Sequence, residues 1–222
     1  TDLKPETGWN YEIGTKGHFW DHNLFFDLSV YHIRIDNMLV TKREAEDIFT
    51  AINAGKTSHT GLESYFRYNK ILGSNILNKI VLWGAFTISD NHFVDFTDDG
   101  VNHSGNILPG IPLNMLNSGI TFQMPNDISI HAEYRRVGAQ FMNDENTLKY
   151  QPYQLLNSKL EYEYENPGNK IYFRIYAQVK NVFNTSYASM ILVNAPSFGG
   201  RQPRYYYPGN PSMLFLGASI QF

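Results

Sequence analysis

The chain has no cysteine among its 222 residues, so disulfides are excluded, as are zinc and iron–sulfur sites with cysteine ligands. Charged residues are scarce, at 18%, against about 25% in average soluble domains. The net charge of −3 leaves no basic footprint, and we expect no nucleic-acid partner. No stretch approaches about 18 consecutive apolar residues, so no transmembrane helix is expected. The aromatic content of 15% argues against disorder.

The sequence also lacks the short motifs of common enzymes. No G-x-S-x-G, H-E-x-x-H or Walker pattern is present, so we expect neither a catalytic residue nor a cofactor. The segment 95–106 begins like a calcium-binding loop, with Asp95, Thr97, Asp99 and Gly100 at the template positions. The template ends on a glutamate where this segment has asparagine, and an ordinary polar loop is therefore expected.

Alternation of apolar and polar residues dominates what is present. Ile171, Phe173 and Ile175 alternate with Tyr172 and Arg174, which is the pattern of a β-strand with one apolar and one polar face. Similar patterns predict about nine strands, and these span residues 9–19, 24–40, 54–70, 79–89, 114–124, 128–135, 156–164, 171–180 and 214–222.

Two segments depart from the simple pattern. Within 24–40 the apolar positions change phase between Val30 and Tyr31, which indicates a β-bulge or a strand that runs past its packed zone. Residues 41–49 (TKREAEDIF) predict one short loop helix.

The predicted connections alternate in length. Tight turns rich in Pro, Gly, Asn and Asp lie near residues 21–23, 72–75, 125–127 and 166–169, and long loops lie near 41–53, 90–111, 138–150 and 184–210. Strict alternation is typical of outer-membrane β-barrels, which have short periplasmic turns and long extracellular loops. A soluble β-sandwich also alternates apolar and polar residues, but it usually has shorter strands.

Aromatic residues gather beside the tight turns. Around the first turn these are Phe19, Trp20, Phe25 and Phe26, and the chain ends on Phe222. Phe122 precedes the third turn, and Tyr162, Tyr164, Tyr172 and Phe173 flank the fourth. A ring of aromatics at one height is what a membrane–water interface selects; ordinary core aromatics are the alternative.

Four segments resemble the TonB-dependent outer-membrane receptors, which import siderophores and other iron complexes into Gram-negative bacteria. They are 53–63 (NAGKTSHTGLE), 108–112 (LPGIP), 179–187 (VKNVFNTSY) and 207–222 (YPGNPSMLFLGASIQF). Ser212 departs from the family pattern, in which arginine often follows the second proline. The four segments occur in the family's order, which makes the resemblance specific. It covers most of the chain from about residue 8.

The resemblance implies a transmembrane, antiparallel, up-and-down barrel of 22 strands around a plug domain. Residues 1–222 would form its last nine strands, so we expect a fragment without the plug, the segment that contacts the TonB energy-coupling complex, or the earlier strands. The expected partners are the lipid bilayer, the rest of the barrel and the plug. The final strand resembles the signal read by the barrel-assembly machinery, with Gly217, Ile220 and Phe222 as the recognised positions.

Two groups of residues are candidate site residues. Those on polar strand faces would line the lumen and meet the plug: Glu63, Arg67, Glu133, Arg135, Lys159, Glu161 and Arg174. Those in the last long loop would bind an anionic or aromatic substrate through charge and stacking: Arg201, Arg204, Tyr205 and Tyr206. For the tyrosines, anchoring of the outer rim is the alternative.

The sequence therefore predicts an outer-membrane transporter, not an enzyme, that imports a ferric siderophore with energy from TonB. A TonB-dependent or passive barrel for sugars or another nutrient is the first alternative, and a soluble β-sandwich binding module is the second.

Overall fold

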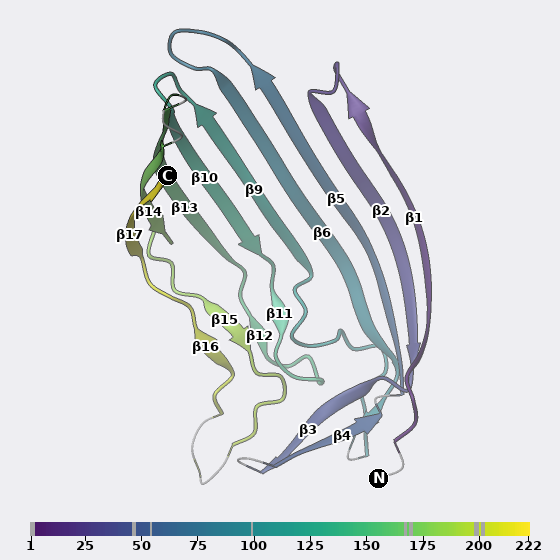
Figure 1. The fold of residues 1–222 in the computed structure, drawn as a ribbon. Helices are drawn as coiled ribbons and strands as arrows, with labels where there is room; N and C mark the ends of the chain where they lie inside the picture. The colour runs from purple at the N-terminus through teal and green to yellow at the C-terminus, as the bar shows by residue number, and fades with distance from the viewer. Residues whose placement is uncertain are drawn as a thin grey trace.

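One antiparallel sheet makes up most of the molecule. The computed structural model describes residues 3–45, 48–53, 55–98, 100–166, 168, 171–197, 200 and 203–222. Nine strands pair in chain order within this part of the chain (Figure 1). They are β1 (Thr7–Phe19), β2 (Leu24–Asp36), β5 (Lys56–Ile71), β6 (Lys79–Asp95), β9 (Asn114–Gln123), β10 (Ile128–Val137), β13 (Tyr153–Asn166), β14 (Ile171–Lys180) and β17 (Met213–Gln221).

Short strands decorate one end of the sheet. They form four hairpins: β3 (Leu39–Ala45) with β4 (Ile48–Asn53), β7 (Thr97–Asp98) with β8 (Val101–Asn102), β11 (Gln140–Phe141) with β12 (Lys149–Tyr150), and β15 (Ala188–Ile191) with β16 (Tyr206–Pro208). All four lie in the long connections, at the bottom of Figure 1, and the short turns lie at the top. The all-β, up-and-down prediction is confirmed; the total of 22 strands stays a prediction.

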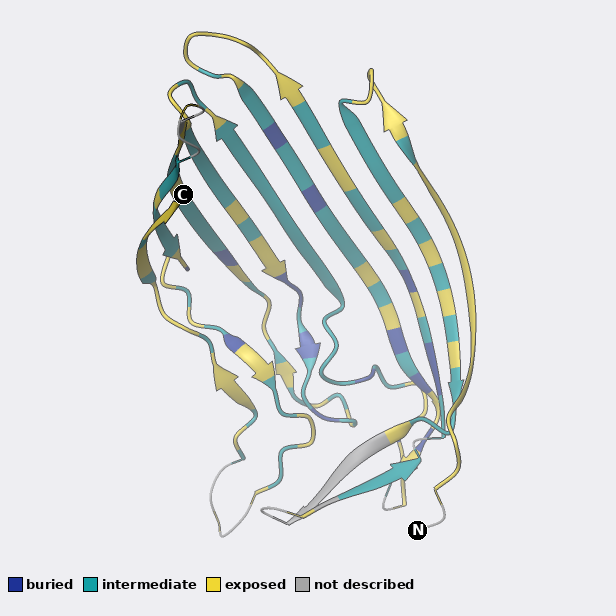
Figure 2. Ribbon diagram, in the orientation of Figure 1, coloured by how far each residue is buried: buried dark blue, intermediate teal, exposed yellow. Residues whose placement is uncertain are grey.

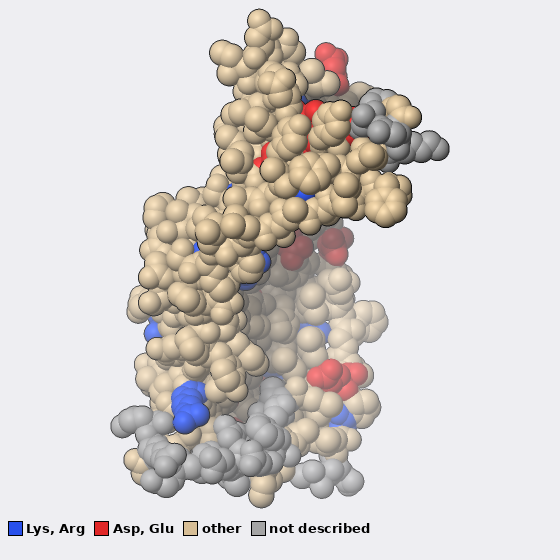
Figure 3. Space-filling model, turned by 60° about the vertical axis from the view of Figure 1, so that its left-hand side comes forward, with Lys and Arg blue, Asp and Glu red and all other residues tan. Residues whose placement is uncertain are grey.

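The sheet is a single curved layer, hollow on one side (Figure 3). Its convex face bears apolar residues with nothing packed on them, and Ile13 and Leu216 are 77% and 74% exposed. Figure 2 shows how sparse the fully buried positions are. A β-sandwich would bury this face against a second sheet, so the β-sandwich alternative is wrong. No helix in the part of the chain that the structure describes is long and apolar enough to cross a bilayer.

The phase change in β2 is not a bulge. The strand pairs with β1 and β5 in unbroken register over its whole length. The irregularity falls in the β5–β6 pairing, where Lys56 and Thr57 pair with Asp95 and Phe93 and leave Val94 of β6 over. Beyond Val30 the outward positions are polar, beginning with His32 and Arg34. The strand therefore extends past its apolar zone, which was the second of the two interpretations.

The predicted helix in 41–49 is wrong, because the structure forms the β3–β4 hairpin there. Residues 46–47 lie outside the described part. Several residues of the two strands are β-branched, which favours extended backbone: Val40, Thr41, Ile48, Thr50 and Ile52. The charged run KREAED had suggested a helix, but ladder pairing with the neighbouring strand overrides such local propensity.

Most glycines in the nine long strands lie opposite an aromatic residue of a neighbouring strand; Gly8 and Gly14, opposite Ile35 and Ser29, do not. Five such cross-strand pairs occur, namely Gly17 with Phe26, Gly61 with Tyr31, Gly84 with Phe66, Gly119 with Trp83, and Gly217 with Tyr176. In each pair a side-chain Cβ on the glycine would meet the ring, at 2.4 Å for Gly119 and Gly217. The rings therefore cover bare backbone, which compensates for the missing glycine side chains.

The two motifs nearest the C-terminus touch each other. Asn181, 4% exposed and at a φ of 51°, donates from Nδ2 to the carbonyls of Thr185 and Asn210. A Cβ on Gly209 would lie 2.2 Å from the ring of Tyr187. Segments 179–187 and 207–222 therefore act as one unit that leads the chain out of β14 and back into β17.

The aromatics beside the short turns contact one another. Phe19 stacks on Phe26 with ring centroids 5.1 Å apart, and Trp20 meets Tyr68 edge-on at 6.1 Å. Phe19 and Trp20 are 57% and 70% exposed. Phe25 instead points to the concave side, where it meets Tyr65. The outward-facing members of this cluster are therefore not core aromatics, and their place in an interfacial girdle stays a prediction.

Candidate functional site at the long-loop end

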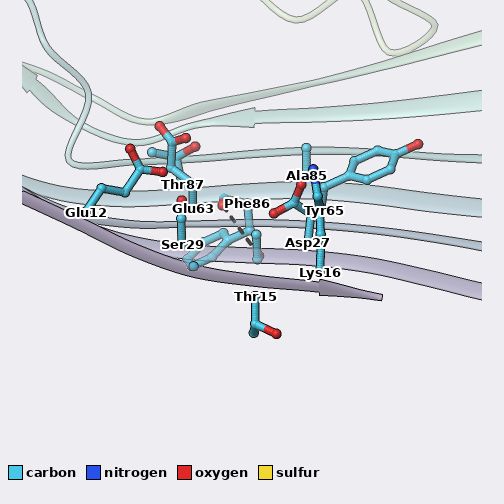
Figure 4. Close-up of a pocket in the computed structure, with 12 residues that line it drawn as sticks. Glu12, Thr15, Lys16, Asp27, Ser29, Glu63, Tyr65, Ala85, Phe86 and Thr87 are labelled. Atoms are coloured by element: carbon cyan, nitrogen blue, oxygen red, sulfur yellow. Dashed lines mark hydrogen bonds between the residues drawn. The ribbon is translucent and has the colours of Figure 1, made fainter. Parts of the chain in front are cut away.

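The concave face is a polar wall. Glu12, Lys16, Asp27 and Glu63 point into the same open space, which has a volume of about 610 Å³, and Thr15 points the other way (Figure 4). The pairing register places all seven of the predicted lumen residues on this face: Glu63, Arg67, Glu133, Arg135, Lys159, Glu161 and Arg174. Their role towards a plug stays a prediction.

The wall is most charged where β10, β13 and β14 meet. Glu161, only 7% exposed, accepts a hydrogen bond of 2.6 Å from Lys159 Nζ and lies 3.5 Å from His131 Nε2. His131 is also fixed by Thr121, whose Oγ1 lies 3.0 Å from Nδ1. Arg174 Nε is buried without a hydrogen-bond partner among the described residues. Such a charged surface requires solvent or a polar partner.

A larger cavity, of about 940 Å³, lies among the long loops. Its floor is the tightest core of the molecule, formed by Phe93, Phe96 and Leu108 at 1%, 2% and 4% exposure. Phe93 and Phe96 stack with ring centroids 4.6 Å apart. The segment 190–196, Tyr205 and Tyr207 also line the cavity. The size suits a small-molecule ligand, for which pockets of about 300–1,000 Å³ are usual.

Asparagine side chains tie three long loops together around this cavity. Asn146 Oδ1 accepts from the Ile107 amide at 2.7 Å, and its Nδ2 donates to the Ile107 carbonyl at 2.8 Å. Asn194 Nδ2 donates to Asp144 Oδ2 at 2.6 Å, and Asn194 Oδ1 accepts from the Asp144 amide at 3.0 Å. Asn146 and Asn194 have φ angles of 58° and 50°, a region in which asparagine is enriched. The loops therefore form one connected platform.

The cavity rim carries acid groups. Asp98, Asp144 and Glu145 line it, together with the buried His103. Burial raises the pKa of the Asp144 carboxyl above its ordinary value; the hydrogen bond from Asn194 and the nearby His103 lower this pKa, and the charges of Asp98 and Glu145 raise it. The pKa of Asp144 therefore depends on the charges of Asp98, Glu145 and His103 as well as on burial.

The predicted substrate residues that the structure describes do not share one site. Tyr205 lines the cavity, but Tyr206 turns away and meets Tyr150 edge-on at 5.3 Å. Arg204 is exposed and does not line the cavity, and Arg201 lies outside the described residues. Tyr207, which sequence reasoning did not select, does line it. Tyr205 immediately precedes β16, and the two-residue period of extended backbone gives it the same face as Tyr207; this was the signal available in the sequence.

Two further predictions concern the assembly signal in the final strand and the calcium-like segment 95–106. Gly217 lies under the Tyr176 ring, while Ile220 and Phe222 are 62% and 96% exposed. Their role as an assembly signal stays a prediction. In the calcium-like segment, Asp99 lies outside the described residues. Among the described residues, no group of three or more His, Cys, Asp or Glu is placed to hold a metal ion.

Comparison with known proteins gives a consistent family. The sequence model described as "TonB dependent receptor-like, beta-barrel" matches residues 1–182. The catecholate siderophore receptor Fiu of Escherichia coli (strain K12) is 24% identical over 226 residues, which cover 100% of this chain and 27% of that protein. The chain thus spans about a quarter of the length of the curated relatives it matches.

Solved structures share the fold. The ferric preacinetobactin receptor BauA from Acinetobacter baumannii has a TM-score of 0.72 at 19% identity, over 97% of this chain and 29% of that one. The ferric yersiniabactin uptake receptor FyuA from Yersinia pestis has a TM-score of 0.71 at 17% identity, over 98% of this chain and 30% of that one.

Proposed function

Because the chain belongs to the TonB-dependent receptor β-barrel family, we propose that it forms nine consecutive strands of an outer-membrane barrel that imports a ferric siderophore. Residues 1–222 are then the last part of a 22-stranded barrel around a plug domain. The relatives support this class of substrate, since their names include a catecholate siderophore receptor and receptors for ferric preacinetobactin and ferric yersiniabactin.

The observation that carries the proposal is the contrast between the two faces of one unclosed sheet. The convex face exposes Ile13 and Leu216, which suits lipid, and the concave face carries Glu63, Lys159 and Glu161, which suits a wet lumen. Closing the barrel removes the free edges of β1 and β17, which would otherwise recruit other strands.

Transport in this proposal involves binding and conformational change without covalent chemistry or a resident cofactor. The iron complex binds among the long loops on the extracellular side, where the cavity and its tyrosines lie. The TonB complex then pulls on the plug, and the polar wall supplies charged and hydrogen-bonding groups along the path that opens. The barrel-assembly machinery inserts the protein into the outer membrane through the final strand, at Gly217, Ile220 and Phe222.

The test is uptake of radiolabelled iron by cells with and without the gene for the complete receptor. We expect siderophore-dependent uptake and growth under iron limitation to fall in the deletion strain and in a strain without TonB. Normal iron uptake in the deletion strain, combined with a loss of growth on a sugar or another nutrient, would overturn the choice of substrate.

A further inference from the structure

The convex face continues beyond its apolar zone on β1, β2, β5 and β6. The pairing register aligns the outward-pointing residues of these strands in rows across the sheet. The last apolar row before the long-loop end consists of Ile13, Val30, Leu62 and Ile88. β9 begins beside Ile88, at Asn114, whereas these four strands run on past the row. One sector of the sheet therefore extends above the apolar zone.

Polar residues occupy this extension, which we call the outer belt. Its first row is Tyr11, His32, Thr60 and Asp90, its second row is Trp9, Arg34, Ser58 and His92, and the pair Asp36 and Lys56 follows. Trp9 and Tyr11 are 68% and 64% exposed. The belt points away from the concave side, because every second residue of a strand shares one face and Ile13 and Val30 lie on the convex one.

The outer belt is taller than the head-group layer of a phospholipid bilayer. Successive outward residues are about 6.6 Å apart along a strand, so a strand tilt of about 40° puts each row about 5 Å above the one before. The row of Trp9 and Arg34 is then about 10 Å above Val30. A phospholipid head group occupies only about 5–7 Å beyond the hydrocarbon. Trp9 would therefore stand in water above phospholipids.

The charges of the outer belt balance one another. Lys56 Nζ lies 3.9 Å from Asp36 Oδ1, and His92 Nδ1 lies 3.5 Å from Asp90 Oδ2. With neutral histidines, the formal charges of Arg34 and Lys56 cancel those of Asp36 and Asp90. Such a surface gives little net attraction to a phosphate group, but it presents many side chains that form hydrogen bonds with hydroxyl groups.

A sugar ring matches the side chains of the outer belt. The C–H groups of the sugar form an apolar face that packs on an aromatic ring, and its hydroxyls exchange hydrogen bonds with polar neighbours. Trp9 and Tyr11 supply two ring systems on the same face of β1. Beside them, His32 Nδ1 lies 2.8 Å from Thr60 Oγ1. The second ring nitrogen of His32 and the N–H groups of Arg34 add further hydrogen-bonding groups.

We propose that the outer belt binds the saccharide head group of a membrane glycolipid, whose acyl chains lie against the row of Ile13 and Val30. The inference rests on the proposed function, which places the convex face in the outer membrane. A glycolipid is favoured over a free saccharide, because the belt continues directly from the apolar row on the same strands. A head group of several sugar rings reaches the row of Trp9, which a phospholipid head group does not.

The first test counts the lipids that the complete receptor retains. The purified receptor is equilibrated with equal amounts of phosphatidylcholine, phosphatidylglycerol and digalactosyl diacylglycerol, a glycolipid without charge, and native mass spectrometry counts the bound molecules of each. We expect the receptor to retain about three- to tenfold more of the galactolipid than of either phospholipid. The ratio should not change with salt, because the charges of the belt cancel.

The second test removes the groups that would hold the sugar. In the belt variant, Trp9→Leu, Tyr11→Leu and Arg34→Gln together should bring retention of the galactolipid down to that of the phospholipids. A matched control removes the same kinds of side chain from the short-turn end of the sheet and should keep the wild-type ratio; it carries Trp20→Leu, Tyr68→Leu and Lys70→Gln.

The outcomes are distinct from those that test the proposed function. Equal retention of the three lipids by wild-type receptor overturns the inference, even if the belt variant does not assemble. Preferential retention of phosphatidylglycerol that falls at high salt contradicts it in favour of an anionic head group. Displacement of the galactolipid by an equal concentration of free digalactose contradicts it in favour of a soluble saccharide. The proposed function fails separately, if deletion of the gene leaves iron uptake unchanged.

Discussion

The most specific packing in this molecule is that of aromatic rings over strand glycines. Trp83 covers Gly119 on the concave face, and Phe66 covers Gly84 on the convex one. A glycine leaves a gap in a strand, and the ring of the opposing residue fills it. The same geometry gives Gly217 a packing role beside Tyr176, independent of any role in assembly.

Substitution of one of these glycines should therefore destabilise the sheet. In Gly119→Ala the new Cβ meets Trp83 Nε1 at 2.4 Å, and displacing the ring should cost about 1–3 kcal/mol. Urea unfolding of the receptor in lipid measures this loss. Gly8→Ala is the matched control, since its Cβ makes its nearest contact at an ordinary 3.4 Å; equal stability of the two variants would contradict the packing argument.

Asn146 offers a second prediction for a single residue. Truncation in Asn146→Ala leaves both the amide and the carbonyl of Ile107 without their partners, and should loosen the 96–113 loop by about 1–3 kcal/mol. Amide hydrogen exchange at Ile107 should become faster. Asn10→Ala, on the exposed strand β1, serves as the control and should leave this exchange rate unchanged.

Among the elements, the long loops are distinguished by contacts between loops as well as within them. The loop after β10 receives Asn194 from the loop after β14 and supplies Asn146 to the loop after β6. Each link joins residues 39 to 50 positions apart. Neighbouring strands bring these loops together, so the platform depends on the order of the sheet.

The half-buried Asp144 carboxyl should make the stability of the long loops depend on pH. The pKa of Asp144 is raised in the folded loops, mainly by burial, so the folded state binds the proton more tightly than the unfolded loop does. The contribution of Asp144 to stability is therefore full at acid pH and is lost as pH rises through the folded pKa. Protease resistance of the 138–152 loop should increase on mild acidification. Asp144→Asn should weaken this response, and an unchanged response would show that Asp144 is not its source.

At the scale of the whole molecule, the curvature of the sheet gives its convex and concave faces different surroundings. Adjacent residues on one strand point to the convex and the concave face in turn, as Leu28 and Ser29 do on β2. Ser29 lies opposite Glu63 on the concave side. The molecule is therefore amphipathic along every long strand, which an average composition hides.

A pair of neighbouring substitutions tests this assignment. Leu28→Arg places a charge on the convex face, which the proposed function turns towards lipid, and near the membrane midplane it should cost about 2–4 kcal/mol. Ser29→Arg points towards Glu63 and should be nearly neutral. The amount of folded receptor in outer-membrane fractions and its unfolding in lipid measure both effects. A larger loss for Ser29→Arg would reverse the two faces.

Much of this architecture follows from local sequence patterns and could be predicted from them. Alternation in a strand such as Ile171–Lys180 fixes which side chains share a face, because successive residues of extended backbone point to opposite sides. Turn residues and loop lengths then set the up-and-down order. The seven wall residues share one face for that reason alone.

Only the tertiary structure decided how the loops meet. Local charge suggested a helix at 41–49, and only pairing made it a hairpin. Nothing in the sequence places Asp144 beside Asn194, or Asp98 and His103 on the same cavity, since these contacts join separate loops held by different strands. The sequence thus determined the wall, by periodicity, and the folded sheet determined the cavity, by bringing distant loops to one rim.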